Sequence, residues 1–107
     1  MFAVIYQFEV KKNMETEFVI NWKQMTQFIY EYEGSLGSRL HKQKKGVYIA
    51  YAQWPSKETW KNSGNKLPHS ATVVRTKMQE TCTKIETLYQ LECVENLTKS
   101  TTYIHTT

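Results

Sequence analysis

The stretch that decides the fold is VYIAYAQW, residues 47–54, which is followed by Pro55 and Ser56. Side chains of a strand point alternately to two faces, and here neither face is polar. One face carries Val47, Ile49 and Tyr51, and the other carries Tyr48, Ala50, Ala52 and Trp54. A strand that is apolar on both faces must be covered on both faces, so we expect residues 47–54 inside a layered domain.

The beginning of the chain repeats this pattern and then changes period. Residues 2–10 predict a strand, with Phe2, Val4, Tyr6, Phe8 and Val10 on one face and Ala3 and Ile5 on the other. From residue 14 to 32 the apolar residues recur at steps of four and three, which predicts a helix. They are Phe18, Trp22, Met25, Ile29 and Tyr32. We expect Asn13 to cap this helix and Gly34 to end it.

The remainder predicts two further strands and two further helices. We expect a strand over residues 35–43, a hairpin turn at Gly46 and a short helix that Ser56 caps and that includes Trp60. A longer helix is expected over residues 71–83 and a last strand over residues 87–95. Residues 1–95 then form one domain, and residues 96–107 form a threonine-rich tail without periodicity.

The predicted order is β-α-β-β-α-β, which is the ferredoxin-like arrangement of an α+β domain with an antiparallel sheet. A single layer of helices covers only one face of such a sheet. The strands that are apolar on both faces would leave a large exposed apolar surface in a monomer. We therefore expect a homodimer in which two sheets pack face to face, with the helices outside.

Composition limits the class of protein. The chain has 107 residues, a formal net charge of +4 and 13% aromatic residues, which is typical of one globular domain. Cys82 and Cys93 form no metal-binding or disulfide pattern, so we expect two reduced thiols. No apolar stretch is long enough to span a membrane and no basic leader precedes one, so we expect a soluble, cytoplasmic protein. We expect no metal and no other cofactor, because neither a ligand cluster nor a phosphate-binding glycine motif is present.

Two segments resemble the antibiotic biosynthesis monooxygenase (ABM) domain family. They are EGSLGSRLH, residues 33–41, and YIAYAQWPS, residues 48–56. The resemblance extends over roughly residues 2–95. It implies a dimeric α+β barrel with a pocket in each protomer between the sheet and the helices. It also implies a cofactor-independent oxidation of a phenol, quinol or anthrone by O₂.

The resemblance transfers to particular positions only in part. Trp54 matches the tryptophan that closes the third strand in the family. Ala50 stands where anthrone-oxidising members have an asparagine, and Trp60 stands where they have a tyrosine. A non-catalytic dimer that binds a small aromatic ligand, as a carrier, sensor or stress protein, therefore remains an alternative to a monooxygenase.

The residues themselves suggest a site. Trp22, Trp54 and Trp60 either form an aromatic cleft for a planar ligand or fill the core, and Tyr6 either binds ligand or packs. The candidate base is His69, because histidine titrates near neutrality and Pro68 places it at a helix entrance. Candidate donors to a substrate oxyanion are Arg75 and Tyr51.

Nucleic-acid binding is the third class, since RNA-recognition domains share this strand order. Residues 45–52 begin with the basic residue and glycine of the RNA-binding strand motif. Val47 and Ile49 then occupy positions where aromatic rings would stack on bases. We therefore expect no nucleic-acid partner.

Overall fold

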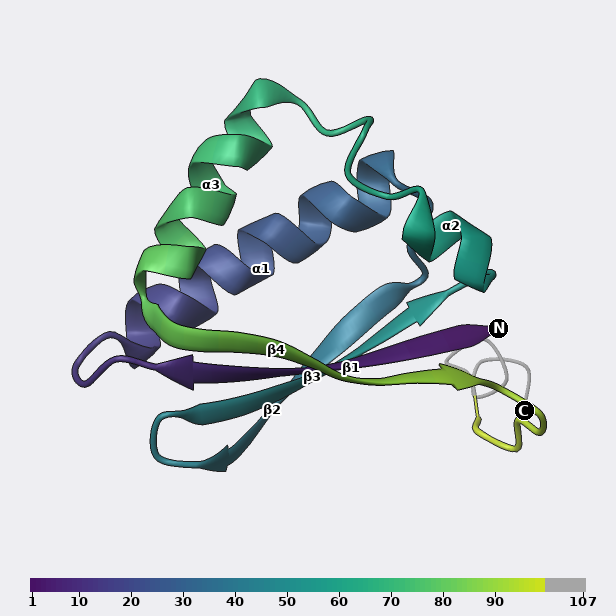
Figure 1. Cartoon of the computed structure of the whole chain (residues 1–107), viewed down its shortest axis with the longest axis horizontal. Coiled ribbons are helices and arrows are strands. Elements are labelled where there is room, and N and C mark those ends of the chain that lie inside the picture. The colour runs from purple at the N-terminus through teal and green to yellow at the C-terminus, as the bar shows by residue number, and fades with distance from the viewer. Residues whose placement is uncertain (100–107) are drawn as a thin grey trace.

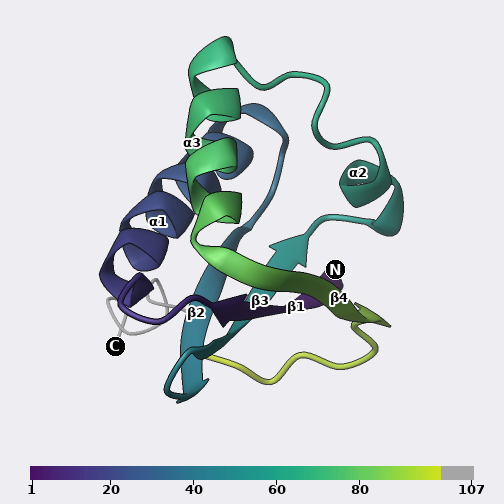
Figure 2. The same cartoon turned by 60° about the vertical axis from the view of Figure 1, so that its left-hand side comes forward.

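The computed structural model describes residues 1–99, which form a four-stranded sheet with helices on one face (Figures 1 and 2). The elements are β1 (Phe2–Val10), α1 (Glu15–Tyr32), β2 (Gly37–Lys44), β3 (Val47–Trp54), α2 (Lys57–Lys61), α3 (His69–Glu80) and β4 (Cys82–Glu92). The sheet is antiparallel in the order β2-β3-β1-β4. This confirms the predicted β-α-β-β-α-β arrangement and the short helix predicted after the third strand, which is α2. The predicted tail lies outside the described residues from residue 100 onward.

The strands β1 and β3 lie at the centre of the sheet, as their two-sided apolar pattern predicts. Along β3 every second side chain is buried on the helix side of the sheet. There Phe18 of α1 packs between Phe8 and Tyr48, with ring centroids 5.0 and 5.1 Å apart. These rings form the core at one end of the sheet. None of the helices within residues 1–99 is long and apolar enough to cross a membrane.

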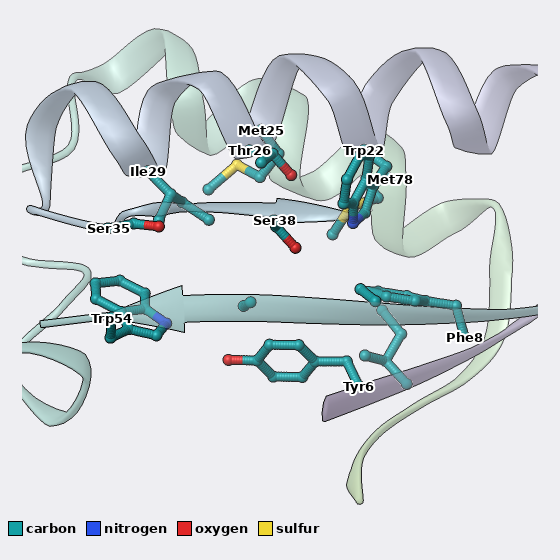
Figure 3. Close-up of a pocket in the computed structure, with 13 residues that line it drawn as sticks. Tyr6, Phe8, Trp22, Met25, Thr26, Ile29, Ser35, Ser38, Trp54 and Met78 are labelled. Atoms are coloured by element: carbon teal, nitrogen blue, oxygen red, sulfur yellow. The ribbon is translucent and has the colours of Figure 1, made fainter. Parts of the chain in front are cut away.

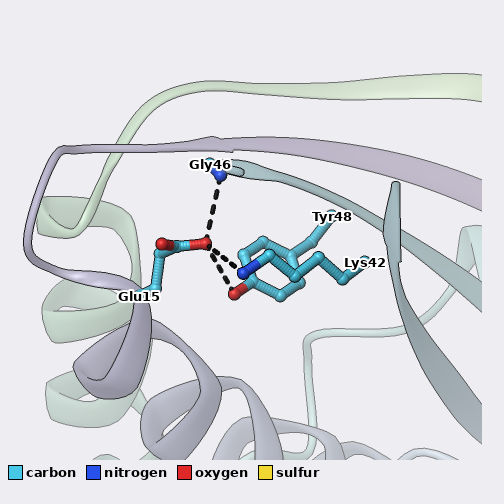
Figure 4. A network of polar contacts seen from close by, with 4 residues as sticks. All are labelled: Glu15, Lys42, Gly46 and Tyr48. Atoms are coloured by element: carbon cyan, nitrogen blue, oxygen red, sulfur yellow. Dashed lines mark hydrogen bonds and ion pairs between the residues drawn. The ribbon is translucent and has the colours of Figure 1, made fainter. Parts of the chain in front are cut away.

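A polar network fastens the start of α1 to the hairpin between β2 and β3 (Figure 4). One carboxylate oxygen of Glu15 accepts hydrogen bonds from the Gly46 N–H at 3.0 Å and the Tyr48 hydroxyl at 2.9 Å. Lys42 forms an ion pair with the same oxygen at 3.2 Å. The Gly46 hydrogen bond, followed by those from Tyr48 and Lys42, holds the pKa of Glu15 below its ordinary value.

The prediction that Asn13 caps α1 is wrong. Asn13 adopts a left-handed backbone conformation with φ of 67°, and the helix begins two residues later at Glu15. Asparagine tolerates this conformation better than most residues, so it serves the tight turn after β1 instead. The Ser56 cap of α2 is confirmed, because its hydroxyl accepts a hydrogen bond from the Thr59 N–H at 3.1 Å.

The last helix and strand both begin earlier than predicted. The helix α3 spans His69–Glu80 rather than residues 71–83, and β4 begins at Cys82 rather than at residue 87. The Lys11 N–H donates to the Thr81 carbonyl at 2.8 Å, which starts the pairing of β4 with the end of β1. Leu88 is an extra residue in this pairing: Tyr6 lies opposite Thr87, whereas Ile5 lies opposite Tyr89. This β-bulge breaks the alternation on which a strand prediction depends.

A buried carboxylate holds the connection between α2 and α3. Glu33, just after α1, is among the buried charged residues. Its Oε2 accepts hydrogen bonds from the N–H groups of Gly64 at 2.7 Å and Lys66 at 3.0 Å. This long loop is therefore tied to the end of α1.

Candidate active site

A cavity of about 170 Å³ lies between α1 and the sheet (Figure 3). Its lining is almost entirely apolar and comes from all four strands, from α1 and α3, and from the segment before β2. The lining residues are Tyr6, Phe8, Trp22, Met25, Thr26, Ile29, Ser35, Ser38, Ala50, Ala52, Trp54, Met78 and Ile85.

Two alanines of β3 leave room for the cavity. Ala50 and Ala52 occupy the helix-facing positions of the central strand, and Ala50 lies directly opposite Tyr6 on β1. Their methyl groups are the smallest side chains that still present an apolar surface. Above them, Trp22 and Ile29 project from the same face of α1, because residues seven apart lie two helical turns from each other. The cavity is thus bounded by aromatic rings and aliphatic side chains, and on the side of β3 by the two alanine methyl groups.

Trp54 closes one end of the cavity and has a polar atom without a partner. Its side chain is 3% exposed, and its Nε1 makes no hydrogen bond within the described part of the chain. Figure 3 shows this nitrogen on the side of the ring that faces the cavity. An unsatisfied buried donor costs about 1–3 kcal/mol, so such atoms are rare and call for an explanation. A ligand that brings an acceptor into the cavity would satisfy it.

Tyr6 contributes the second polar group of the lining. Its hydroxyl accepts a hydrogen bond from Nε1 of Trp60 on α2 at 2.9 Å. Burial raises the pKa of Tyr6 above its ordinary value, and the hydrogen bond from Trp60 opposes that rise only in part. Tyr6 is therefore protonated at neutral pH and acts as a hydrogen-bond donor rather than as a base.

The serine hydroxyls of the lining donate to the backbone. Ser38 donates to the Tyr51 carbonyl at 3.1 Å, and Ser35 donates to the Gln53 carbonyl at 3.3 Å. These bonds tie the segment from residue 35 to 38 to β3 and use the hydroxyl protons. The indole of Trp54 and the phenol of Tyr6 are then the aromatic groups that can offer a proton to a ligand, and the Thr26 hydroxyl on α1 is a further polar group of the lining.

The structure brings together three of the seven site residues that the sequence predicts. Trp54, Trp22 and Tyr6 line the cavity, and Trp60 lies behind Tyr6 without lining it. The ring of Trp60 packs on Phe2 at a centroid distance of 5.9 Å.

The three predicted acid–base and oxyanion residues do not reach this cavity. His69 is exposed at the first turn of α3, and Arg75 lies further along that helix. From α3 only Met78 lines the cavity among the described residues. Tyr51 points to the opposite face of the sheet, because it is one residue out of phase with Ala50 and Ala52.

Some lining residues were not predicted. Ile85 was missed because the last strand was expected to begin only at residue 87. Ser35 and Ser38 were missed because their contacts depend on the pairing of β2 with β3, which a local pattern does not reveal. Within residues 1–99, no three histidine, cysteine, aspartate or glutamate side chains are grouped as a metal site would require.

Comparison with known proteins gives a family and a common fold. The family model described as antibiotic biosynthesis monooxygenase matches residues 1–75. No curated protein matches the chain.

Several solved structures share the fold at low sequence identity. SnoaB, a cofactor-independent oxygenase from Streptomyces nogalater, is 14% identical with a TM-score of 0.73, covering 92% of this chain and 97% of its own. Rv0793 from Mycobacterium tuberculosis is 13% identical with a TM-score of 0.69, covering 91% and 98%. A protein from Caulobacter crescentus is 22% identical with a TM-score of 0.69, covering 88% and 90%.

Proposed function

Because the chain belongs to the antibiotic biosynthesis monooxygenase family, we propose that it oxidises a small phenol or quinol with O₂ in the cavity between α1 and the sheet. The observation that carries this proposal is the unpartnered Nε1 of Trp54, a buried hydrogen-bond donor in a largely apolar cavity. An aromatic ring suits the apolar walls, and a phenolic or quinonoid oxygen suits the donor.

The volume of the cavity narrows the substrate. A cavity of roughly 150 Å³ in another protein takes up benzene, whereas typical ligand pockets begin near 300 Å³. The 170 Å³ available here matches one substituted ring. Polycyclic anthrones exceed it, so the proposal is confined to substrates with a single ring.

The reaction takes its electrons from the substrate. In a monooxygenation, a phenol and O₂ give a quinone and water: one oxygen atom becomes the new carbonyl and the other leaves as water. In the simpler case, a quinol and O₂ give a quinone and hydrogen peroxide. Both routes begin with loss of the phenolic proton to water at the cavity mouth, followed by electron transfer from the anion to O₂.

The protein contributes three things to this chemistry. The rings and aliphatic walls hold the substrate in one orientation and exclude bulk water. Trp54 donates a hydrogen bond to the substrate oxygen as its negative charge develops. The small side chains of Ala50 and Ala52 leave room for the substrate ring above β3.

Oxygen consumption by the purified protein tests the proposal. We expect saturable uptake with one-ring hydroquinones and phenols, above the rate of autoxidation, and a loss of roughly 10²-fold in Trp54→Phe, as for removal of an oxyanion donor. Tyr51→Phe is the matched control, since Tyr51 lies on the other face of the sheet, and it should retain the wild-type rate. Uptake that Trp54→Phe leaves unchanged, or no uptake across a broad panel, would contradict the proposal.

A ligand-binding role without turnover is the second candidate. It is favoured by one observation: among the described residues, Tyr6 is the only titratable side chain that lines the cavity, and its pKa is raised rather than lowered. A carrier needs no base. It would show ligand-induced thermal stabilisation without oxygen uptake.

A further inference from the structure

We propose that Tyr6, held by Trp60, makes the cavity selective for the anionic form of a one-ring phenol. This rests on the ligand class of the proposed function, but it does not require turnover. Tyr6 lies on β1, next to Ala50 of the paired strand β3. Its hydroxyl therefore reaches the cavity from the strand beside β3.

The direction of the hydrogen bond to Tyr6 decides what the hydroxyl can do. Nε1 of Trp60 is a donor only, so at 2.9 Å it must use a lone pair of the Tyr6 oxygen. No group within residues 1–99 accepts the phenolic proton of Tyr6 in turn. The proton is left for a ligand, and the bond from Trp60 makes the hydroxyl a stronger donor by polarising it.

A second donor approaches from another element. Nε1 of Trp54 at the end of β3 also lacks an acceptor, and Figure 3 shows that nitrogen and the Tyr6 oxygen directed into the same space. No carboxylate, histidine, lysine or arginine lines this space from α1, α3 or any strand of the described chain. The lining therefore offers protons and has no base to accept one, so a ligand oxygen is recognised as an acceptor.

The expected effect on a bound phenol has a definite sign. An apolar cavity alone disfavours charge and raises the pKa of a buried phenol, as it does for Tyr6 itself. Two donors aimed at the oxygen act in the opposite direction, because hydrogen bonds to a charged acceptor are the stronger ones. Burial alone would raise the pKa of the bound phenol, so a lowered pKa would show that the two donors act on its oxygen.

The experiment titrates 4-nitrophenol bound to the full-length protein, because its phenolate absorbs visible light. We expect phenolate to bind about tenfold more tightly than phenol, so that the apparent pKa of the bound probe falls by about one unit. In Tyr6→Phe the preference should disappear or reverse. In Trp60→Phe, which keeps the tyrosine and removes only its partner, an intermediate preference is expected.

The remaining outcomes are decisive as well. Failure of the wild-type protein to bind 4-nitrophenol, or an unchanged or raised pKa of the bound probe, would overturn the proposal. So would a lowered pKa that Tyr6→Phe retains, since Trp54 would then act alone. If Tyr6→Phe does not fold, as thermal unfolding would show, Trp60→Phe supplies the same comparison. Phenolate selectivity without oxygen uptake would overturn the proposed oxidation and leave this inference standing.

Discussion

Trp54 combines a large buried ring with one donor atom that lacks a partner, so stability and ligand binding depend on different parts of the same side chain. The ring fills the end of the core beside Phe2 and Val4. The Nε1–H adds nothing to that packing and carries a desolvation cost. The two contributions can be separated by measuring unfolding and ligand binding in one variant that keeps an aromatic ring and lacks the nitrogen.

Trp54→Phe should leave the free energy of unfolding nearly unchanged while weakening ligand binding. Loss of the unsatisfied donor recovers about 1–3 kcal/mol, and the smaller ring gives up a similar amount through the void that it leaves. Affinity for 4-nitrophenolate should fall about tenfold with the loss of one hydrogen bond to a charged oxygen. Denaturant titration and absorbance binding measure the two quantities. A variant destabilised by several kcal/mol with unchanged affinity would show that Trp54 serves the core alone.

Ala50→Leu tests whether the space above β3 is open. A leucine there enters the cavity, so we expect stability to be retained or raised by about 1 kcal/mol and phenol binding to be lost. Ala71→Leu is the matched control. Ala71 is fully buried in α3 and does not line the cavity, so a leucine there should cost about 1–3 kcal/mol through overpacking. Equal destabilisation of both variants in guanidinium unfolding would argue against a ligand space.

Among single residues, the sequence predicts the apolar lining of the cavity better than its hydrogen bonds and its acid–base groups. Trp22 and Trp54 follow from periodicity, because large apolar residues at regular spacing face the core. Tyr6 and Trp60 form a hydrogen bond although they are 54 residues apart in the sequence, and no local pattern predicts that contact. The prediction of His69 as a base rests on its residue type, which says nothing about where its side chain lies.

At the scale of elements, two glutamates connect segments that are distant in the chain. Glu15 joins α1 to the β2–β3 hairpin, and Glu33 joins the end of α1 to the loop before α3. The Glu15 contact fixes the start of α1 over the sheet, and the Glu33 contact fixes the end of α1 against that loop. The width of the cavity beneath α1 therefore depends on them.

Glu15→Gln should reduce stability at neutral pH and much less in acid. The pKa of Glu15 is lowered in the folded protein, so its stabilising contribution is complete above its ordinary value of 4.5 and is lost as pH falls through the lower folded value. The difference between wild type and variant should shrink below about pH 4.5. Urea unfolding across this range measures it, with Glu17→Gln in the same helical turn as control. A difference that is constant with pH would contradict the role given to the charge.

Glu33→Ala should destabilise the protein by about 1–3 kcal/mol, because two backbone N–H groups lose a charged acceptor. The amides of Gly64 and Lys66 should lose protection from hydrogen exchange, while those of β3 keep theirs. Glu31→Ala, at an exposed position two residues earlier on α1, is the matched control and should change neither quantity. Unaltered exchange at both amides would refute the contact.

The elements with regular patterns were predicted closely, and those that depend on distant pairing were not. The bounds of β3 agree residue for residue with the prediction, and those of α1 differ by one residue. The strand β4 was placed five residues too late, since Thr83, Lys84 and Glu86 interrupt its apolar pattern and Leu88 shifts its phase. Its pairing with β1, rather than its own composition, makes it a strand.

At the scale of the molecule, the sheet has one face under the helices and one bare face. The bare face is rich in apolar side chains, and Tyr89 and Leu91 on it are 61% and 45% exposed. Ile5, Ile49 and Tyr51 continue this surface across β1 and β3. We propose that a second copy of the chain covers it.

Tyr89→Glu should convert a dimer into a folded monomer. Its side chain is exposed in the single chain, so a charge there should cost the protomer little and a face-to-face interface a great deal. Light scattering after gel filtration gives the mass, and circular dichroism checks the fold. Tyr30→Glu, with a comparable exposure on α1, should remain dimeric. A wild-type protein of monomer mass at micromolar concentration would rule the interface out.

The bulge at Leu88 has a genetic consequence. Before it, Ile85 and Thr87 lie on the cavity side of the sheet; after it, Tyr89 and Leu91 lie on the bare side. Deleting the single codon for Leu88 would remove the extra residue and leave Tyr89 opposite Ile5, so strict alternation returns and every following side chain keeps its face. Tyr89 would stay on the bare side, and the space that a ligand now has would be unchanged. The strand β4 therefore has one residue more than its pairing needs: we expect the in-frame loss of one codon there to be tolerated, whereas the same loss in β3, whose pairing with β1 has no bulge, would turn part of its side chains to the wrong face.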